Sequence, residues 1–459
     1  MLIRAAEIRG RGRADVRISG GCIAEIGELP AVSGEAVIEA GGGALLPGLH
    51  DHHIHLAGLA ARAASVPCGP PEVTSAEELA RALQRPGNGW IRGIGYHESV
   101  MGLPDSRALD RLVADRPLRI QHRSGRLWLL NSMGLAELLE RAKAPVGLDR
   151  EKGHLFDEDR WLQTALASSQ PDLSHVSRDL ACCGVTGVTD MSPRNDATNA
   201  TPISRQVAAG SLLQRCILAG TLSLADAAPG PWTLGPAKLH LHEAALPDFD
   251  ETTRFIAAAH RQGRGVAVHC VSEVELVFAL AALEAAGAGP GDRPGDRIEH
   301  ASIAPDELIA RMAALELAVC VQPHFVAERG DRYLADVEPR HQPHLYRQRS
   351  LIAAGIPLAG GSDAPFASHD PWTAMAAAVS RRTRDGRTIG ADEALSPEAA
   401  LALYLADPLD LTRQRSVVPG APADLCLLDR PWSAARETLS CRMVRATFVS
   451  GQLIHQAPA

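Results

Sequence analysis

The stretch Pro47-Gly48-Leu49-His50-Asp51-His52-His53-Ile54-His55 follows an apolar run and places two imidazoles, His53 and His55, two positions apart. If the segment is a strand, its side chains alternate between two faces, so Asp51, His53 and His55 share one face and the remaining histidines share the other. Two neutral imidazoles on one face can chelate a single divalent ion. A histidine-rich turn gives the same pattern, so the rest of the chain must decide between the two.

A repeated alternation of strand and helix fills the middle of the chain and indicates parallel strands joined by crossover helices. With the strand that ends at His55, we expect eight barrel strands. The other seven are 185–191, 213–219, 237–242, 265–271, 297–302, 317–325 and 357–363. Eight such units favour a closed (β/α)8 TIM barrel, of the α/β class, over an open doubly wound sheet. No Gly-x-Gly-x-x-Gly motif follows a strand, which weakens the second architecture.

Both ends of the chain alternate short β-like segments with glycine-rich turns. Neither end has enough strands for a core of its own, so we expect 1–46 and 416–459 to form one small β-sandwich domain. The barrel would then occupy 47–415. An insertion at about 56–174 follows the first barrel strand, and we expect it to lie over the barrel mouth and to form part of a substrate pocket.

Composition limits the class of protein. The 459 residues exceed the roughly 250 to 300 at which a single core stops growing, which suits one large and one small domain. With a net charge of −8 and no basic run, nucleic-acid binding is not expected. Nine scattered cysteines without a Cys-x-x-Cys argue against a disulfide framework or a thiolate zinc site. The longest apolar run, 276–283, is too short for a membrane span, so we expect a soluble, cytoplasmic protein without a membrane partner.

Further polar side chains lie toward the ends of four other predicted strands. They are Lys238, His269, His300 and Asp363. The carboxyl ends of barrel strands meet at one rim, so these side chains should converge with His53 and His55. Each of them alone is typical of a capping, turn or ion-pairing role. Their coincidence predicts a metal centre.

These residues, together with Gly361-Ser362-Asp363 and the tail segment 419–425, resemble the amidohydrolase superfamily. The insertion, with Trp90-Ile91-Arg92-Gly93 and the segment 127–132, is similar to its YtcJ-like branch, amidohydrolase family 3, which includes N-substituted formamide deformylases. The resemblance covers nearly the whole chain. It implies a metal-dependent enzyme that hydrolyses carbon–nitrogen bonds other than peptide bonds, in an amide or N-acyl compound.

The resemblance also implies roles for the strand-end residues. His53 and His55 would hold one ion, and His269 and His300 a second. Asp363 would bind the first ion and act as the catalytic proton shuttle. Zinc is the expected metal because the ligands are histidines and carboxylates, although manganese and iron also suit such ligands. One or two ions per chain are compatible with this set.

By the same resemblance, Lys238 would bridge the two ions. A protonated lysine repels cations, but a neutral amine can add carbon dioxide and become an anionic carbamate with two oxygens. The alternative is an ordinary ion-pairing lysine. A mononuclear site would then remain, with His300 in a supporting or catalytic role and with these ligands: His53, His55, His269 and Asp363.

The implied mechanism starts from the ion rather than from a protein nucleophile. An ion lowers the pKa of bound water toward about 7 and polarises a carbonyl group. Asp363 would accept the water proton and pass it to the departing nitrogen. No Gly-x-Ser-x-Gly motif offers a competing serine nucleophile.

Four residues are candidates for contacting the substrate, each with a plainer alternative. His97 in the insertion could reach the barrel mouth. Arg126 could pair with a substrate carboxylate, or could be a solvated surface arginine. His240 shares a strand face with Lys238, where it could also be a metal ligand or a satisfied polar group. His324 resembles the family's Gln-Pro-x-His region at the end of the seventh strand, with a core histidine as the alternative.

Two other functions stay open. One is a mononuclear deaminase of the same fold that attacks an amidine carbon, which requires Lys238 to be unmodified. The other is a barrel without catalysis that serves as a scaffold, which the complete ligand set disfavours. We expect a small-molecule substrate. The identity of the substrate and the oligomeric state, a homo-oligomer included, are not determined by the sequence.

Overall fold

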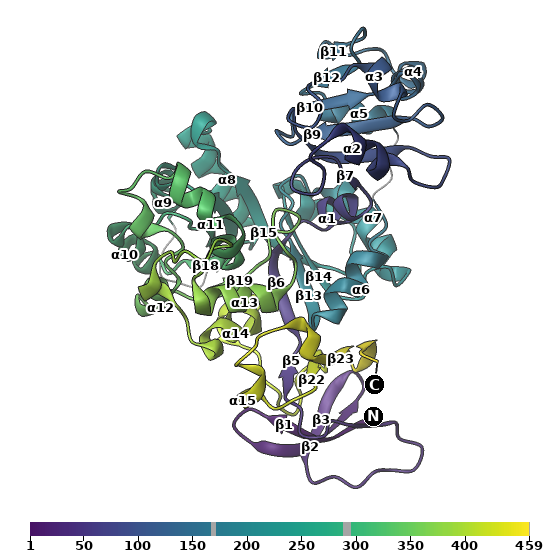
Figure 1. The fold of residues 1–459 in the computed structure, drawn as a ribbon. Coiled ribbons are helices and arrows are strands. Elements are labelled where there is room, and N and C mark those ends of the chain that lie inside the picture. Colours follow the sequence, from purple (N-terminus) through teal and green to yellow (C-terminus); the bar gives the residue numbers. More distant parts are fainter. Residues whose placement is uncertain (167–170, 288–294, 459) are drawn as a thin grey trace. The chain divides into compact units, whose positions relative to one another are not determined.

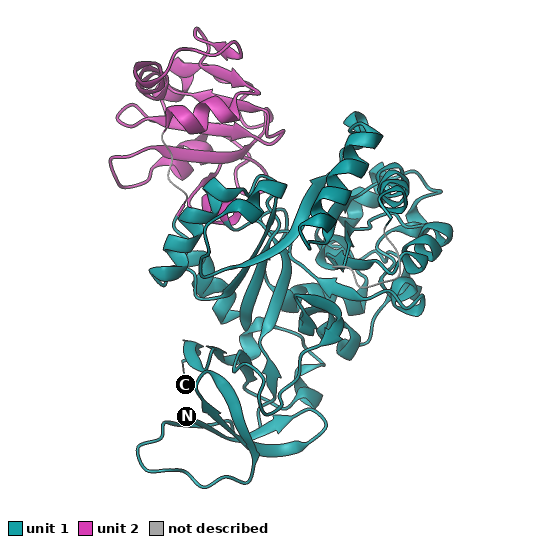
Figure 2. Cartoon of the chain, turned by 180° about the vertical axis from the view of Figure 1, so that it is seen from behind, with its two compact units in different colours: residues 1–56, 172–459 teal, residues 57–171 magenta. Residues whose placement is uncertain are grey.

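The computed structural model describes residues 1–166, 171–287 and 295–458. The chain divides into two compact units, shown in different colours in Figure 2. The first consists of Met1–Leu56 and Asp172–Ala459, and the second of Ala57–Pro171. A large parallel sheet, two four-stranded sheets and a two-stranded sheet lie in the first unit, and a six-stranded sheet lies in the second.

The centre of the first unit is a sheet of eight strands, all paired in parallel (Figure 1). In sheet order they are β19 (Leu358–Gly360), β18 (Ala318–Val321), β17 (Arg297–His300), β16 (Val266–Cys270), β15 (Thr233–His240), β14 (Arg215–Gly220), β13 (Val185–Asp190) and β6 (Leu49–Ile54). Ile54 forms a parallel bridge with Ala364, just beyond β19. This bridge joins the first strand to the last, so the predicted (β/α)8 barrel is confirmed.

Helices connect most of the successive barrel strands, and two more follow the last strand. They are α6 (Ser174–Cys182), α7 (Ala197–Ala208), α8 (Phe249–Arg261), α9 (Glu273–Ala285), α10 (Asp306–Ala314), α11 (His324–Asp336), α12 (Gln348–Ala353), α13 (Pro371–Ser380) and α14 (Pro397–Leu405). The last two begin with proline after a capping side chain, Asp370 or Ser396, that accepts a backbone N–H. No helix within the described ranges combines the length and apolar character that a bilayer span requires.

One predicted strand is shorter than expected. We predicted a strand over 317–325, but β18 ends at Val321 and α11 begins at His324. The reason is Pro323, which cannot donate to a strand ladder and has the backbone angles of a helix start. His324 therefore opens a helix, and its predicted place at the end of a strand is wrong.

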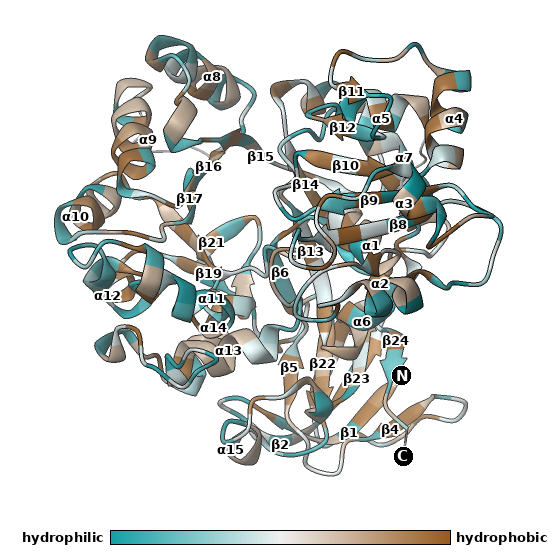
Figure 3. Cartoon of the chain, turned by 45° about the horizontal axis from the view of Figure 1, so that its top comes forward, coloured by the Kyte–Doolittle hydropathy of each residue, from teal (hydrophilic) through white to brown (hydrophobic). Residues whose placement is uncertain are grey.

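Two four-stranded sheets from opposite ends of the chain share one hydrophobic core. The first contains β3 (Cys22–Gly27), β2 (Gly12–Ser19), β1 (Leu2–Ile8) and β4 (Val37–Glu39); the second contains β24 (Gln452–Gln456), β23 (Val444–Val449), β22 (Leu425–Leu428) and β5 (Leu45–Pro47). In Figure 3, β1, β22 and β23 carry largely hydrophobic residues. β5 pairs with β22, which confirms the predicted β-sandwich built from both termini. The exact limits proposed for this domain stay a prediction.

The second unit has its own sheet and its own apolar clusters. In order, its strands are β11 (Leu148–Asp149), β12 (His154–Phe156), β10 (Leu127–Leu130), β9 (Leu118–His122), β8 (Ile91–Tyr96) and β7 (Val66–Pro67). Its helices are α1 (Leu56–Ala63), which starts at the boundary, α2 (Ala76–Leu83), α3 (Ser106–Asp110), α4 (Ser132–Arg141) and α5 (Asp159–Ala165). The position of the insertion over the barrel mouth stays a prediction.

Three further short elements lie in the first unit. They are β20 (Ala406–Asp407), β21 (Asp410–Gln414) and α15 (Trp432–Ala435). β20 and β21 form a small antiparallel pair directly after α14. They lie between the last barrel helix and the returning strands of the sandwich, and so form part of the connection between the two.

Closure of the barrel depends on a glycine after β19. A Cβ atom at Gly361 would lie 2.5 Å from Cβ of His53 and 2.6 Å from its backbone nitrogen. We expect Gly361→Ala to lower the free energy of unfolding by about 1 to 3 kcal/mol, because both backbones are held in strand pairing. Urea unfolding measures this change. Gly295→Ala is the control, because a Cβ there meets nothing within 4 Å, and an equal loss in the control would contradict the argument.

Candidate metal centre

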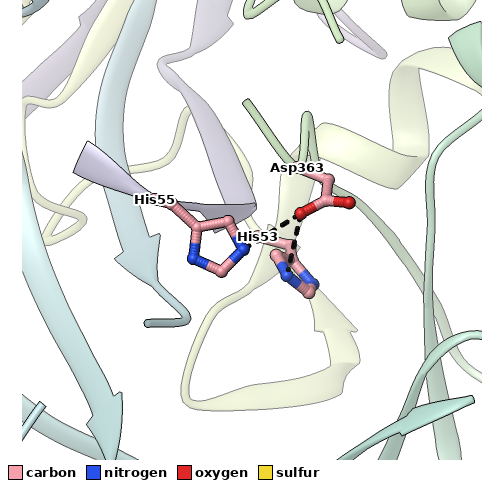
Figure 4. Close-up of side chains that lie close together, drawn as sticks. All are labelled: His53, His55 and Asp363. Atoms are coloured by element: carbon pink, nitrogen blue, oxygen red, sulfur yellow. Dashed lines mark hydrogen bonds and ion pairs between the residues drawn. The ribbon is translucent and has the colours of Figure 1, made fainter. Parts of the chain in front are cut away.

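The ends of the first and last barrel strands bring three predicted ligands together. Oδ1 of Asp363 lies 3.0 Å from Nε2 of His55 and 3.4 Å from Nε2 of His53 (Figure 4). The backbone N–H of Asp363 donates to the carbonyl of His53 at 2.6 Å, which holds the two strands in this register. The three side chains offer donor atoms within 4.8 Å of one another, a spacing that suits one metal ion.

The other predicted histidines continue from this group as a row of rings. The ring centroid of His300 lies 5.0 Å from that of His53 and 4.6 Å from that of His269. The ring of His240 stacks on His269 at 4.3 Å. These histidines come from the ends of β6, β15, β16 and β17, so the predicted convergence at one rim is seen in the structure.

Lys238 lies on β15 with only 5% of its surface exposed. Its Nζ has no hydrogen-bond partner among the described residues. Burial lowers the pKa of Lys238, which favours the neutral amine. The charges that act on it include Glu299 and Asp363, so the amine belongs to the same buried cluster as the strand-end histidines.

The buried imidazoles are held in the neutral form that binds metals. Burial lowers the pKa of His53 to about 3, and it also lowers the pKa of His269 and of His300. Burial alone would raise the pKa of Asp363, but the nearby His53 and the hydrogen bond with His55 lower it overall. The centre therefore combines neutral nitrogen donors with one anionic carboxylate.

Glu299 fixes the orientation of His53. Oε2 of Glu299 lies 2.5 Å from Nδ1 of His53, and because a carboxylate only accepts, Nδ1 carries the proton. Nε2 of His53 then presents a lone pair to the carboxylate of Asp363, without a hydrogen bond. Two lone pairs that face each other at 3.4 Å repel unless a cation lies between them.

Gln322 gives His300 the same orientation. The side-chain carbonyl of Gln322 lies 2.7 Å from Nδ1 of His300, so Nδ1 donates and Nε2 keeps its lone pair. Nε2 is buried and has no hydrogen-bond partner among the described residues. Buried polar atoms are nearly always satisfied in folded proteins. The unpaired nitrogens of His53, His300 and Lys238 therefore fit a divalent cation better than they fit an empty core.

Backbone strain contributes to this convergence. Glu299 and His300 are neighbours, and neighbours in a regular strand point to opposite faces. His300 has a φ of 73° and Asp363 a φ of 51°, both in the left-handed region. Such angles cost about 1 to 3 kcal/mol each and are found at functional sites, although Asp and His tolerate them better than most residues. The turn at His300 ends the alternation, so both side chains can reach the centre.

Asp51 links β6 to the segment that carries Asp363. One oxygen of its carboxylate accepts the backbone N–H of His53 at 3.0 Å and that of Ser362 at 2.9 Å. Burial raises the pKa of Asp51 to about 7. The carboxylate of Asp51 therefore holds the backbone of the site in place. His50 packs against His52 and bonds to Thr189.

Glu299→Gln tests the role of the orienting carboxylate. We expect metal affinity to fall about 10- to 100-fold, because the amide holds the His53 tautomer less firmly and removes a negative charge. Equilibrium dialysis followed by elemental analysis measures the affinity. Glu299 also pairs with buried Arg297, so stability will fall as well. Glu393→Gln is the matched control, since it breaks a buried pair with Arg347 and should leave metal affinity unchanged.

Comparison with known proteins assigns the chain to a family. The sequence profile described as "Amidohydrolase family" matches residues 36–455. The chain belongs to the amidohydrolase family. The motif resemblance is thereby confirmed, and so is the predicted class of enzyme, a metal-dependent hydrolase of carbon–nitrogen bonds.

Relatives of this amidohydrolase extend over almost its full length. It is 26% identical to YtcJ of Bacillus subtilis (strain 168), which is named as an amidohydrolase, over 91% of this chain and 90% of that protein. It is 24% identical to the N-substituted formamide deformylase of Arthrobacter pascens, over 99% of this chain and 97% of that protein. An uncharacterized metal-dependent hydrolase from Pyrococcus horikoshii OT3 shares the fold, with a TM-score of 0.77 at 21% identity over 94% and 96% of the two chains.

Two of the predicted substrate contacts lie in the first unit of the amidohydrolase. His240 is exposed at the end of β15, beside His269. His324 is buried, and its Nε2 lies 2.8 Å from the carbonyl oxygen of Ser362, to which it donates. His324 therefore supports the backbone next to Asp363. Contact of His240 or His324 with a substrate stays a prediction.

The other two lie in the second unit. Nδ1 of His97 lies 2.7 Å from the hydroxyl of Ser99, and its Nε2 lies 3.5 Å from the carboxylate of Glu98. Arg126 forms a bidentate pair with Asp157, so a substrate carboxylate would have to displace this partner. Contact of His97 and Arg126 with a substrate stays a prediction.

The sequence also left two residues of the centre unidentified. Glu299 directly precedes His300, and Gln322 lies two positions before His324. Both histidines were candidate site residues. A hydrogen-bonding residue close to a candidate ligand is a usable signal, because metal-binding histidines usually donate their second nitrogen to such a group. Strand alternation argues against using this signal for Glu299, because alternation places Glu299 on the face opposite His300.

Proposed function

We propose that this amidohydrolase cleaves the carbon–nitrogen bond of an amide or N-acyl compound, a small molecule, with one or two divalent ions. Zinc is the metal that we propose, because the donor set combines imidazoles with carboxylates. The observation that supports the proposal most directly is the pair of facing lone pairs, Nε2 of His53 and Oδ1 of Asp363, in a buried site. A cation between them removes the repulsion.

The residues divide into two groups around the proposed ions. His53, His55 and Asp363 would hold the first, and His269 and His300 the second. Lys238, as a carbamate, would supply the anionic bridge. Its burial, its lowered pKa and its unpaired Nζ all favour the neutral amine that reacts with carbon dioxide. Without the carbamate, the proposed ligands are four imidazoles and one carboxylate, so an added anion also balances the charge of the ions.

The chain's own residues supply the proton transfer. Ions held in this centre would lower the pKa of water toward about 7 and polarise the substrate carbonyl. Asp363, kept anionic by its surroundings, would take the proton of the attacking water and deliver it to the departing nitrogen. Nε2 of His55 lies 3.0 Å from the same oxygen, so these two proposed ligands of the first ion already face each other.

The test combines metal content with a substrate screen. Purified protein is analysed for bound metals, then assayed on N-formyl and N-acyl amines with and without chelator. The N-formyl amines are included because one relative is named as an N-substituted formamide deformylase. We expect one or two ions per chain and hydrolysis that chelator abolishes and zinc restores.

The same experiment separates the rival functions. A single ion, together with release of ammonia from amidines and no cleavage of amides, would identify the mononuclear deaminase instead. A protein that binds no metal and cleaves nothing in either class would support the scaffold. The cytoplasmic location and the oligomeric state stay predictions.

A further inference from the structure

A second group of metal-binding side chains lies away from the barrel rim. Sγ of Cys183, Sγ of Cys441 and the carboxylate of Asp370 lie within 4.8 Å of one another. We propose that these three residues bind a thiophilic divalent cation, with zinc as the representative ion, at a site separate from the catalytic centre. The proposal is independent of the function proposed above.

Three separate parts of the first unit supply the donors. Cys183 caps the C-terminal end of α6, Asp370 caps the N-terminal end of α13, and Cys441 opens the short helix η5 (Cys441–Met443) ahead of β23. The indole of Trp372 donates to the carbonyl of Cys183 at 2.9 Å, which fixes α13 against the end of α6. A cation here would join the barrel helices to the returning strand of the sandwich.

The geometry suits zinc. Zinc binds thiolate sulfur at about 2.3 Å in a tetrahedron, which places two sulfurs about 3.8 Å apart. The three donor atoms already lie within 4.8 Å of one another, so only small side-chain movements would bring them onto one ion. Two thiolates and one carboxylate leave the fourth position for water.

An ion could reach the site past one of the two thiols. Cys183 is buried and Cys441 only partly so, which gives an ion access from the side of η5.

The spacing of cysteines along the chain hid this site. Cys183 and Cys441 are far apart in sequence, and neither belongs to a Cys-x-x-Cys pair. From that pattern we argued against a thiolate zinc site. Such a site can also be assembled by tertiary structure alone, so sequence spacing did not test for it.

Cobalt provides the most specific probe, because a thiolate bound to Co²⁺ gives an intense near-ultraviolet charge-transfer band that histidine and carboxylate ligands do not. We expect the full-length protein to show this band when loaded with Co²⁺. Cys441→Ser and Cys183→Ser should abolish it. Asp370→Asn should weaken binding about tenfold or more, because asparagine keeps the helix cap but removes the ligand charge.

Cys320→Ser is the matched control. Sγ of Cys320 lies close to His53 and Glu299, so it is the thiol that could bind an ion in the catalytic centre. The band should survive this change. If instead the band survives in both Cys183→Ser and Cys441→Ser and is lost in Cys320→Ser, the proposal is overturned.

A second measurement uses the protein without substitutions, so its result does not depend on whether the variants fold. Zn²⁺ should protect Cys441 from alkylation at least tenfold, as peptide mapping under non-reducing conditions would report. Equal alkylation with and without Zn²⁺ would contradict the site. A disulfide between Cys183 and Cys441 that forms in place of the cobalt band would contradict it as well.

Discussion

Asp363→Asn is expected to lower kcat by about 10²- to 10⁴-fold, the contribution of a positioned acid–base group. Asparagine has nearly the same shape and tolerates the φ of 51° found here, so the backbone cost is small. The amide can neither take the proton of water nor hand it to the departing nitrogen. Steady-state hydrolysis of the best N-acyl amine from the screen measures the loss.

Loss of metal must be separated from loss of proton transfer, because Asp363 is also a proposed ligand. The rate is therefore expressed per bound ion, with bound metal measured in the same samples. Asp248→Asn, which caps α8 on the surface, is the control and should keep full activity. A variant at position 363 that retains its metal and more than a tenth of the normal kcat would remove Asp363 from the proton transfer.

Most of the barrel could be predicted because short strand-like segments and helical segments alternate along the chain. Burial on both faces gives each barrel strand a short, continuous apolar run, and this signal is strong. Convergence of His53, His55, His269 and Asp363 then follows from topology alone, since parallel strands end at one rim. No knowledge of side-chain packing was needed for that step.

The remaining parts depend on contacts that sequence periodicity does not encode. One is the left-handed turn at His300. Another is the hydrogen bond from Nδ1 of His53 to Glu299, which joins β6 to β17 across 246 residues of sequence. The early end of β18 at Val321 comes from a single proline that our strand prediction ran through. The cluster of Cys183, Asp370 and Cys441 is likewise assembled only by the fold.

Lys238→Met is expected to lower kcat/KM by at least about 10³-fold while the free energy of unfolding stays equal or rises. The activity falls because the bridge is lost, and metal ions contribute several kcal/mol to transition-state stabilisation, where 1.36 kcal/mol is tenfold in rate. Stability does not fall because methionine fills a similar volume and removes a buried Nζ that has no hydrogen-bond partner among the described residues.

Bicarbonate distinguishes a carbamate from an ordinary lysine at this position. Metal-free protein should regain activity slowly with zinc in buffer depleted of carbon dioxide, and faster when bicarbonate is added, because the amine must react before it can bridge. Lys152→Met, an exposed substitution, should keep this response, whereas Lys238→Met should not show it. Recovery that is independent of bicarbonate, with one ion bound per chain, would mean that Lys238 is unmodified and that the centre is mononuclear.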